Sequence, residues 1–453
     1  MRSLLSFILT GTVGLTAGCT SGLWGPFTQD TESNCNVTPS LCATGQSCNA
    51  VTGLCEGGSV ADMGVPPSGP IFGQERLVTS LATSYFSMAI GDLTKGDKTD
   101  ILLSADTENL LILSGDDNFS ASSAETFSLS GGQKPTYSVN YTQDGRHDAI
   151  VATVTGKIIY VLKKDTTTAK VEIDSGLGPG YLVLDVGYAN DDNTPDLVVT
   201  SSKLSLISQI LLGTMVGTGN ASVFLGALNA TMTPQPLKLG RTDLCFAAAA
   251  RQPDMELGLA LSKPRDTSTT LLQITGSTIN GTGNQHSPMP EHDFAIPTDL
   301  DKDGDLDLVL VKTFELPTPG NLTSGKVHYL MNNGNVKSPM FTQDATQLNS
   351  SYLIGAQVDD FDGDGYPDIV VAEYVEKRFR VYHNLGLAQT SFSAPFDLSG
   401  TYGARSAYFQ DLDGDGCKDL VALFGGDESG GAATRGSEIK IVRGRFKAGG
   451  TCQ

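Results

Sequence analysis

The sequence predicts an all-β fold, a seven-bladed β-propeller, and three observations support this. Acidic, glycine-containing loops recur along most of the 453-residue chain, and a short apolar run follows each of them. The recurrences lie about fifty residues apart, which is the size of one propeller blade. The segments between them have the short, alternating pattern of β-strands, and no sustained helical period appears.

The acid that ends each loop marks the repeats. These acids lie 48, 48, 60, 51, 61 and 51 residues apart, at Asp100, Asp148, Asp196, Glu256, Asp307, Asp368 and Asp419. The fourth unit is degraded, and we place it at 246–256 because the gap from Asp196 to Asp307 is about twice the other spacings. A parallel β-helix would need much shorter repeats, and a row of sandwich domains would need longer ones.

Each unit is expected to hold a short strand before the loop, an apolar strand after it, an alternating third strand and a more variable outer strand. Alternating third strands are expected at 157–162, 326–330, 378–382 and 438–442. The last unit ends near Arg445, whereas a spare strand-like segment, 75–81, precedes the first loop. We therefore predict that this N-terminal segment forms the outer edge of the final blade and closes the ring, because closure removes exposed edges.

Three loops share the pattern D-x-D-x-D-G-x-x-D, beginning at Asp299, Asp360 and Asp411. Alternating Asp residues at positions one, three and five direct three carboxylates inward, and Gly at position six permits the positive φ of a sharp turn. The carbonyl at position seven and the Asp at position nine supply further oxygens. Calcium takes about six to eight oxygen ligands and tolerates uneven geometry, whereas magnesium demands a tighter octahedron. The pattern therefore favours calcium.

A helix–loop–helix calcium site would need Glu at position twelve. Leu310, Val371 and Ala422 stand there, inside apolar runs. The loops within the seven-unit array instead resemble the FG-GAP/VCBS repeat family, the seven-bladed propellers of integrin α subunits and many bacterial surface proteins. The resemblance covers roughly residues 72–446.

The resemblance implies three calcium ions, each held by four side chains and one backbone carbonyl. The implied ligands are Asp299, Asp301, Asp303 and Asp307 with the carbonyl of Asp305; Asp360, Asp362, Asp364 and Asp368 with that of Tyr366; and Asp411, Asp413, Asp415 and Asp419 with that of Cys417. We expect these ions to be structural, because binding at the turn between two inner strands becomes folding free energy.

The remaining loops match less well. A fourth, weaker site at Asn140, Thr142, Asp144 and Asp148 stays open, because these residues keep the outline of the pattern. The loop at 190–196 lacks the turn glycine, and Thr94 and Gly96 interrupt the loop between Asp92 and Asp100. The fourth unit has Ala at positions one and three, so we expect it to be metal-free.

The N-terminus predicts export and lipidation. Residues 1–18 read as a signal peptide, with Arg2 before an apolar stretch and Leu15-Thr-Ala-Gly before Cys19. This resembles a bacterial lipobox, in which Cys19 carries the lipid. A simple signal peptide with an incidental Cys is the alternative. The apolar stretch is too short for a membrane span, so lipid at Cys19 is the expected membrane contact, at the outer membrane or cell surface.

A tether at 19–34 leads to a Cys-rich module at 35–55. Its cysteines, Cys35, Cys42, Cys48 and Cys55, are expected to form two disulfides in an oxidising compartment. A zinc site is the rival interpretation, although paired C-x2-C spacings are missing. A Gly/Pro/Ser-rich linker at 56–71 precedes the propeller at 72–453. Cys417 and Cys452 could pair, which would leave Cys245 as a free thiol.

Composition excludes some functions. A formal charge of −20 makes nucleic acid an improbable partner, since binding it needs a basic surface. No nucleophile elbow, nucleotide loop or metalloprotease motif appears in a convincing context. His286 and His292, which lie near Glu291 and Asp293, are expected in an exposed loop.

We therefore predict a non-catalytic, calcium-stabilised adhesion or binding lipoprotein of the cell envelope, with a glycan, protein or matrix ligand. A polysaccharide lyase or hydrolase and a scaffold subunit of an envelope complex are the alternatives. Fold alone does not decide between them.

Overall fold

The computed structural model describes two short strands near the N-terminus and most of the chain from residue 72 onward. The described residues are 47–48, 55–56, 72–85, 87–94, 98–105, 109–128, 133–139, 148–153, 155–164, 167–174, 181–187, 196–202, 219–224, 236–238, 246–249, 259–262, 267, 269–275, 278–286, 289–292, 294–303, 307–312, 315–318, 321–323, 325–332, 341–349, 353–386, 391–426, 436–447 and 450–451.

Within them, seven four-stranded antiparallel sheets follow one another along the chain. The first four sheets are β4 (Ser87–Gly91), β5 (Asp100–Ser104), β6 (Asn109–Leu113) and β7 (Glu125–Ser128); β8 (Gln133–Val139), β9 (Asp148–Thr153), β10 (Lys157–Lys164) and β11 (Thr167–Asp174); β12 (Tyr181–Gly187), β13 (Asp196–Ser202), β14 (Gly219–Phe224) and β15 (Pro236–Lys238); and β16 (Phe246–Ala249), β17 (Leu259–Ser262), β18 (Thr269–Thr275) and β19 (Thr278–His286).

The last three are β20 (Phe294–Thr298), β21 (Asp307–Lys312), β24 (Lys326–Asn332) and β25 (Phe341–Asn349); β26 (Leu353–Asp359), β27 (Asp368–Glu373), β28 (Arg378–Tyr382) and β29 (Phe396–Ser399); and β30 (Gly403–Gln410), β31 (Asp419–Gly425), β32 (Ser437–Gly444) and β3 (Phe72–Leu81). Three two-stranded hairpins complete the strands: β1 (Ser47–Cys48) with β2 (Cys55–Glu56), β22 (Glu315–Thr318) with β23 (Asn321–Thr323), and β33 (Phe446–Lys447) with β34 (Gly450–Thr451).

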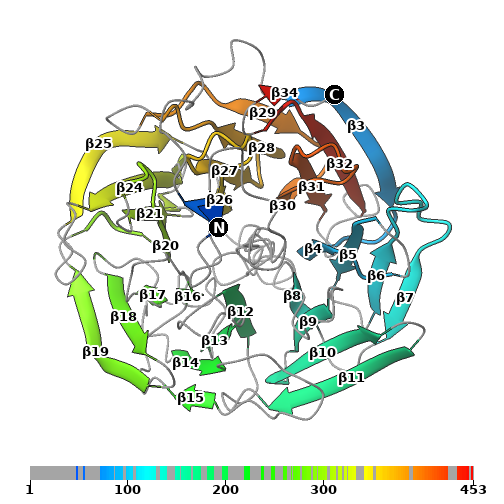
Figure 1. The fold of residues 1–453 in the computed structure, drawn as a ribbon, viewed down its shortest axis with the longest axis horizontal. Helices are drawn as coiled ribbons and strands as arrows, with labels where there is room; N and C mark the ends of the chain where they lie inside the picture. The colour runs from blue at the N-terminus through cyan, green and yellow to red at the C-terminus, as the bar shows by residue number, and fades with distance from the viewer. Residues whose placement is uncertain are drawn as a thin grey trace.

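The sheets are arranged around a common centre. Figure 1 shows the first strand of each sheet nearest the centre and the outer strand at the rim. The inner strands contact one another in sequence around the ring, from β4 through β8, β12 and β16 to β20, and from β26 through β30 back to β4; β21 contacts β26. The predicted all-β propeller class is therefore confirmed.

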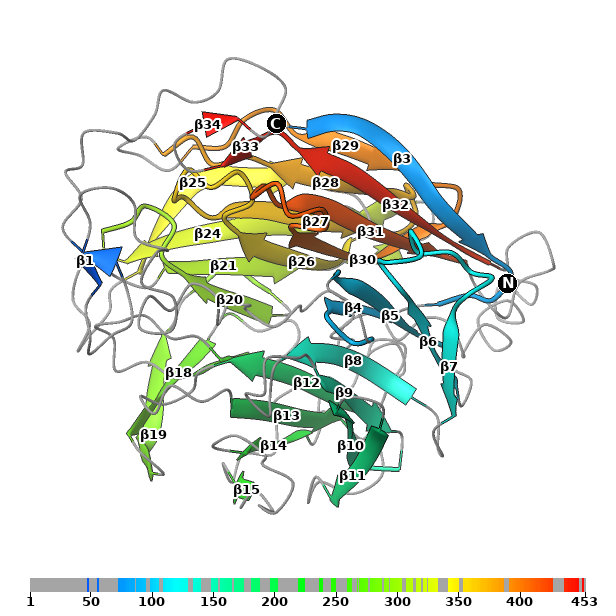
Figure 2. The ribbon, with the colours of Figure 1, turned by 45° about the vertical axis from the view of Figure 1, so that its right-hand side comes forward.

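The N-terminal strand closes the last sheet. β3 pairs antiparallel with β32, with Arg76 opposite Ile441, so the sheet order is β3-β32-β31-β30. Figures 1 and 2 both place β3 along the rim beside β32. The prediction that the segment at 75–81 supplies this outer edge is confirmed, although the strand is longer and begins at Phe72.

The core lies between neighbouring sheets. Every residue of β5, β21, β27 and β31 is buried, because each of these second strands has a packed sheet on both faces. A strand covered on both faces reads as a continuous apolar run rather than an alternating one. A cluster of buried apolar side chains joins the last two sheets through Phe361, Phe379, Phe409 and Phe424.

The described part of the chain contains no helix with the length and hydropathy of a membrane span.

Candidate metal-binding loops

The three Asp-rich loops occupy equivalent places in three consecutive sheets. Each connects a first strand to a second strand, and we call them loop A (299–307, between β20 and β21), loop B (360–368, between β26 and β27) and loop C (411–419, between β30 and β31). Because the loops begin and end on buried strands, the fold fixes both of their ends.

Position nine of each loop holds a buried Asp that fastens the loop to the rest of its sheet. In loop B, Asp368 is fully buried. Its Oδ2 accepts the Phe361 N–H at 3.2 Å, and its Oδ1 accepts the Asn384 N–H, just beyond β28, at 2.7 Å. Leaving either buried N–H without its acceptor would cost about 1–3 kcal/mol.

Loops A and C repeat this arrangement. Asp307 accepts the N–H groups of Leu300 and Asn332, each at 2.8 Å. Asp419 accepts the Gly444 N–H at 3.0 Å and is also hydrogen-bonded to the backbone of Leu412. The position-nine acids are therefore part of the fold, whatever ion the loops bind.

The first sheet shows that this role does not depend on the full acidic pattern. Asp100 accepts the N–H groups of Leu93, Thr94 and Gly115, and the Thr94 hydroxyl donates to the same carboxylate at 3.0 Å. Both of its oxygens are already engaged with the protein. Asp148 begins β9 and is buried; the rest of the proposed fourth site lies outside the described residues, as do the loops before β13 and β17.

Backbone turns aim the remaining acids. In loop B, Asp360 accepts the N–H groups of Gly363 and Gly365 at 2.8 and 3.0 Å, and Gly365 has a φ of 93°. In loop C, Asp411 accepts those of Gly414 and Gly416, both at 2.8 Å, and Gly416 has a φ of 83°. The predicted positive φ at position six is confirmed in both loops.

The turns bring carboxylates together in all three loops. One oxygen from each member lies within 4.8 Å of the others in the groups Asp299, Asp301, Asp303; Asp360, Asp362, Asp368; and Asp411, Asp413, Asp415. Two oxygens bound to one calcium at about 2.3–2.6 Å can be at most about 5 Å apart, so each group fits a single ion. Asp307 and Asp419 fall outside these groups. Asp305 lies outside the described residues, and carbonyl coordination by Tyr366 and Cys417 stays a prediction.

Burial makes the ionised carboxylates costly in loop A as well as in loop B, since it raises the pKa of Asp307 to about 8. Burial raises the pKa of Asp360 and that of Asp362 to about 6, and neighbouring carboxylates add to both shifts. Burial also raises the pKa of Asp368 well above its ordinary value. Such shifts arise when carboxylates are buried close to one another. The buried Oδ2 of Asp362 accepts no hydrogen bond. A divalent cation would satisfy these oxygens in their ionised form.

The strand register reveals a position that sequence reasoning missed. β27 pairs with β28 in the register Ile369↔Tyr382, so the next residue, His383, falls opposite Asp368. We call this the facing position. By the same registers it is filled by Ser114 in the first sheet, Met331 beside loop A, His383 beside loop B and Arg443 beside loop C.

The facing residue contacts loop position three in three sheets. The Ser114 hydroxyl lies 3.4 Å from the Thr94 hydroxyl, His383 Nε2 lies 3.2 Å from Asp362 Oδ2, and Arg443 forms an ion pair with Asp413. Met331 instead packs against the apolar core. In the sequence, Met331, His383 and Arg443 directly follow the third strands predicted at 326–330, 378–382 and 438–442. Their place opposite the loop acid becomes known only from the register.

Two contacts link neighbouring loops. The Asn384 side chain donates to the Leu300 carbonyl of loop A at 2.9 Å and to the Pro367 carbonyl of loop B at 3.1 Å. Lys418 of loop C reaches back to Asp359, just before loop B, at 3.0 and 3.1 Å. Side-chain hydrogen bonds therefore link loop A to loop B, and loop C to the end of the strand that precedes loop B.

The cysteine and histidine predictions are tested only in part. Cys417 is buried and disulfide-bonded, but its partner lies outside the described side chains, so pairing with Cys452 stays a prediction. β1 and β2 place Cys48 opposite Cys55; the other N-terminal cysteines, with Cys19, lie outside the described residues. The expectation that His292 is exposed is wrong. It is fully buried, with Nδ1 2.7 Å from the Pro290 carbonyl.

Comparisons with known proteins support this picture at the level of fold. The model of the FG-GAP-like repeat family matches residues 360–422, from the start of loop B to the middle of β31. No curated protein matches the sequence. Among solved structures, the chain is similar to BBS1N in complex with ARL6DN, in crystals soaked with mercury or with lead. The TM-scores are 0.51 and 0.50, with 12% identity over 83% of this chain and 98% of each matched chain.

Proposed function

We propose that the seven sheets are the blades of a calcium-stabilised, non-catalytic propeller that binds a glycan, protein or matrix ligand at the cell envelope. Loop B carries the proposal, because oxygens of Asp360, Asp362 and Asp368 lie within 4.8 Å of one another. Oxygen ligands in a turn of this kind suit calcium. The proposal includes two further ions, in loops A and C, and leaves open a weaker fourth at Asn140, Thr142, Asp144 and Asp148.

The ions would stabilise the fold rather than perform chemistry. Each proposed ion lies where a first strand turns into a fully buried second strand, and its loop is fastened by a position-nine Asp. A ligand that binds only the folded state stabilises it, by about 2.7 kcal/mol when its concentration is a hundred times the dissociation constant. Calcium in all three loops would stabilise the last three sheets against unfolding.

Calcium titration of the chelator-treated protein tests the metal proposal directly. We expect calorimetry to detect binding and the melting temperature to rise with calcium. In a variant carrying Asp362→Asn and Asp413→Asn, one acid is lost from each of loops B and C, and both effects should shrink. An unchanged melting temperature on chelation would refute the structural role of the ions.

The envelope part of the proposal needs its own test. We propose that Cys19 is lipidated, so wild-type protein should partition with membranes and Cys19→Ser should not. Affinity capture from envelope extracts, with calcium and with chelator, would identify a ligand. Activity on polysaccharides in the purified protein would support the enzyme alternative instead.

A further inference from the structure

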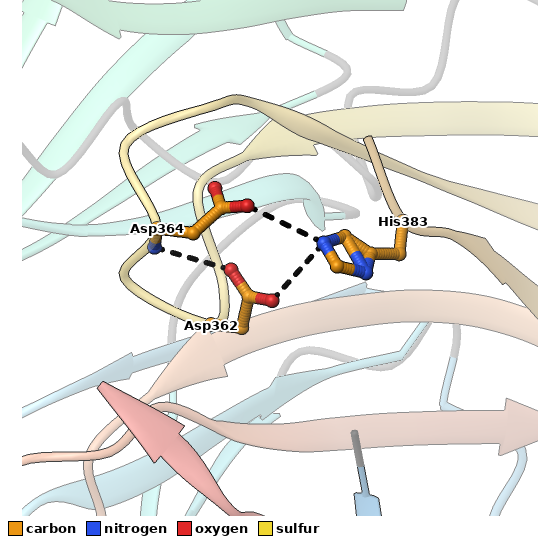
Figure 3. A group of neighbouring side chains, drawn as sticks. All are labelled: Asp362, Asp364 and His383. Carbon is orange, nitrogen blue, oxygen red and sulfur yellow. Dashed lines mark hydrogen bonds and ion pairs between the residues drawn. The ribbon is translucent and has the colours of Figure 1, made fainter. Parts of the chain in front are cut away.

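His383 places an imidazole beside loop B, whereas the facing positions described beside loops A and C hold Met331 and Arg443. Its side chain is buried at the exit of β28, with 4% of the residue exposed. The Nε2 atom lies 3.2 Å from Asp362 Oδ2 and 3.4 Å from Asp364 Oδ2. Figure 3 shows both carboxylates directed at the same ring nitrogen.

Hydrogen bonding alone leaves this arrangement incomplete. One ring nitrogen carries at most one hydrogen, so Nε2 cannot donate well to both acids. The contact with Asp364, at 3.4 Å, is long, and Asp362 Oδ2 accepts no hydrogen bond although the residue is only 4% exposed. Burying an oxygen in this state costs about 1–3 kcal/mol.

The distances match those between ligands of a small transition-metal ion. Two ligand atoms about 2.0–2.1 Å from a tetrahedral zinc ion are about 3.3–3.4 Å apart. Calcium, by contrast, is held by oxygen atoms at longer distances. Neutral imidazole is a preferred ligand of zinc and other late first-row metals.

We propose that Asp362, Asp364 and His383 form a mixed nitrogen–oxygen site for a divalent transition metal, with zinc as the representative ion. Asp362 belongs both to this site and to the group with Asp360 and Asp368. Loop B therefore offers a nitrogen–oxygen site in addition to its group of carboxylates, whereas Met331 and Arg443 at the facing position supply no imidazole nitrogen beside loops A and C.

This inference shares loop B with the proposed calcium function but does not require it. Calcium binding could fail in all three loops while the histidine site still takes zinc, or the reverse. Each metal must therefore be titrated separately.

The test uses the untagged full chain after chelation, because a histidine tag would bind the same metals. Cobalt serves as a visible probe of the site, and zinc is then added to displace it. His383→Gln should weaken zinc and cobalt binding at this site by at least about tenfold, since losing even a residue that only supports a ligand costs about that much. Calcium affinity should stay close to that of wild type. Arg443→Gln, at the same position of the next sheet, is the matched control and should leave zinc binding unchanged.

Equal zinc affinity in wild type and His383→Gln would overturn the proposal, as would failure of wild type to bind zinc or cobalt. Circular dichroism establishes that the variant is folded. If it is not, X-ray absorption at the zinc edge of wild type decides the question, since imidazole scattering is required. Calcium binding without zinc binding would reject this site and leave the calcium proposal standing.

Discussion

Loops B and C have the same sequence pattern and the same backbone hydrogen bonds, but their surroundings differ. In loop B, position three is Asp362, which is 4% exposed and contacts the imidazole of His383. In loop C, position three is Asp413, which is exposed and forms an ion pair with Arg443. The Asp pattern specifies the turn of the loop. The facing residue determines whether the position-three carboxylate contacts an imidazole or a guanidinium.

The largest effect on the free energy of unfolding is expected at position nine, which has the same role in both loops. Asp368→Ala and Asp419→Ala should each lower the free energy of unfolding by about 3 kcal/mol, because two backbone N–H groups lose their acceptor. Chemical denaturation with chelator present measures this cost without bound metal. Asp413→Ala, at an exposed carboxylate, is the control and should cost under about 1 kcal/mol. Equal costs for all three variants would contradict the fastening role of position nine.

The next largest effect is the pH dependence of stability that arises from the buried acids of loop B. With chelator present, Asp360 and Asp362 have pKa values raised to about 6 by burial. A carboxyl with a higher pKa in the folded chain than in the unfolded chain binds more protons when folded. Its contribution is therefore present at low pH and is lost as the pH rises through 6, on the order of 1 kcal/mol for each group.

Melting curves between about pH 5 and pH 8 test this pH dependence. Calcium should reverse the trend, because the folded complex holds both groups ionised. Asp362→Asn should reduce the slope of the chelated protein without removing it, because Asp307 and Asp419, with pKa values raised by burial to about 8 and about 6, titrate over the same range. A chelated wild-type protein whose stability rises over this range would show that the acids of loop B already have another counter-charge.

A smaller effect is expected from Arg443. Arg443→Gln removes a cation that competes with calcium for Asp413 and should raise the calcium affinity of loop C by up to about fivefold, as expected for a partly exposed ion pair. Calcium calorimetry measures the change. Arg445→Gln loses the same charge two residues further on, so it separates the local contact from the general field. Equal effects of the two variants would mean that the Arg443 contact is unimportant.

The smallest effect concerns the bridge between the loops. Lys418→Met should destabilise the protein by under about 1 kcal/mol, because the Lys418–Asp359 pair is partly exposed to solvent. A double-mutant cycle with Asp359→Asn gives the coupling energy. A coupling energy well above this value would indicate that loop C supports loop B more strongly than the contact suggests.

Repetition made the fold readable from the sequence. Apolar runs after each acidic loop predicted the buried second strands, and the spare segment at 75–81 predicted the closing strand β3. The acids of loops A to C were also identified, because their spacing reflects the turn itself. The facing residues were missed, since His383 and Arg443 are ordinary residues in the sequence and come near the acids only through strand register. The hydrogen-bonding role of position nine was missed as well, because one of its backbone donors lies in the loop and the other at the end of the third strand.

The pairing of β3 with β32 joins residues that are separated by nearly the whole described chain, from Phe72 to Gly444. Bringing such distant segments together carries a large loop-closure entropy and is slow. A growing chain therefore cannot complete its ring until β32 has been synthesised. Until then, β3 has no partner strand and the ring of sheets stays open. A premature stop in the last repeat would do more than shorten the protein, because it would leave β3 as an unpaired edge able to join another chain.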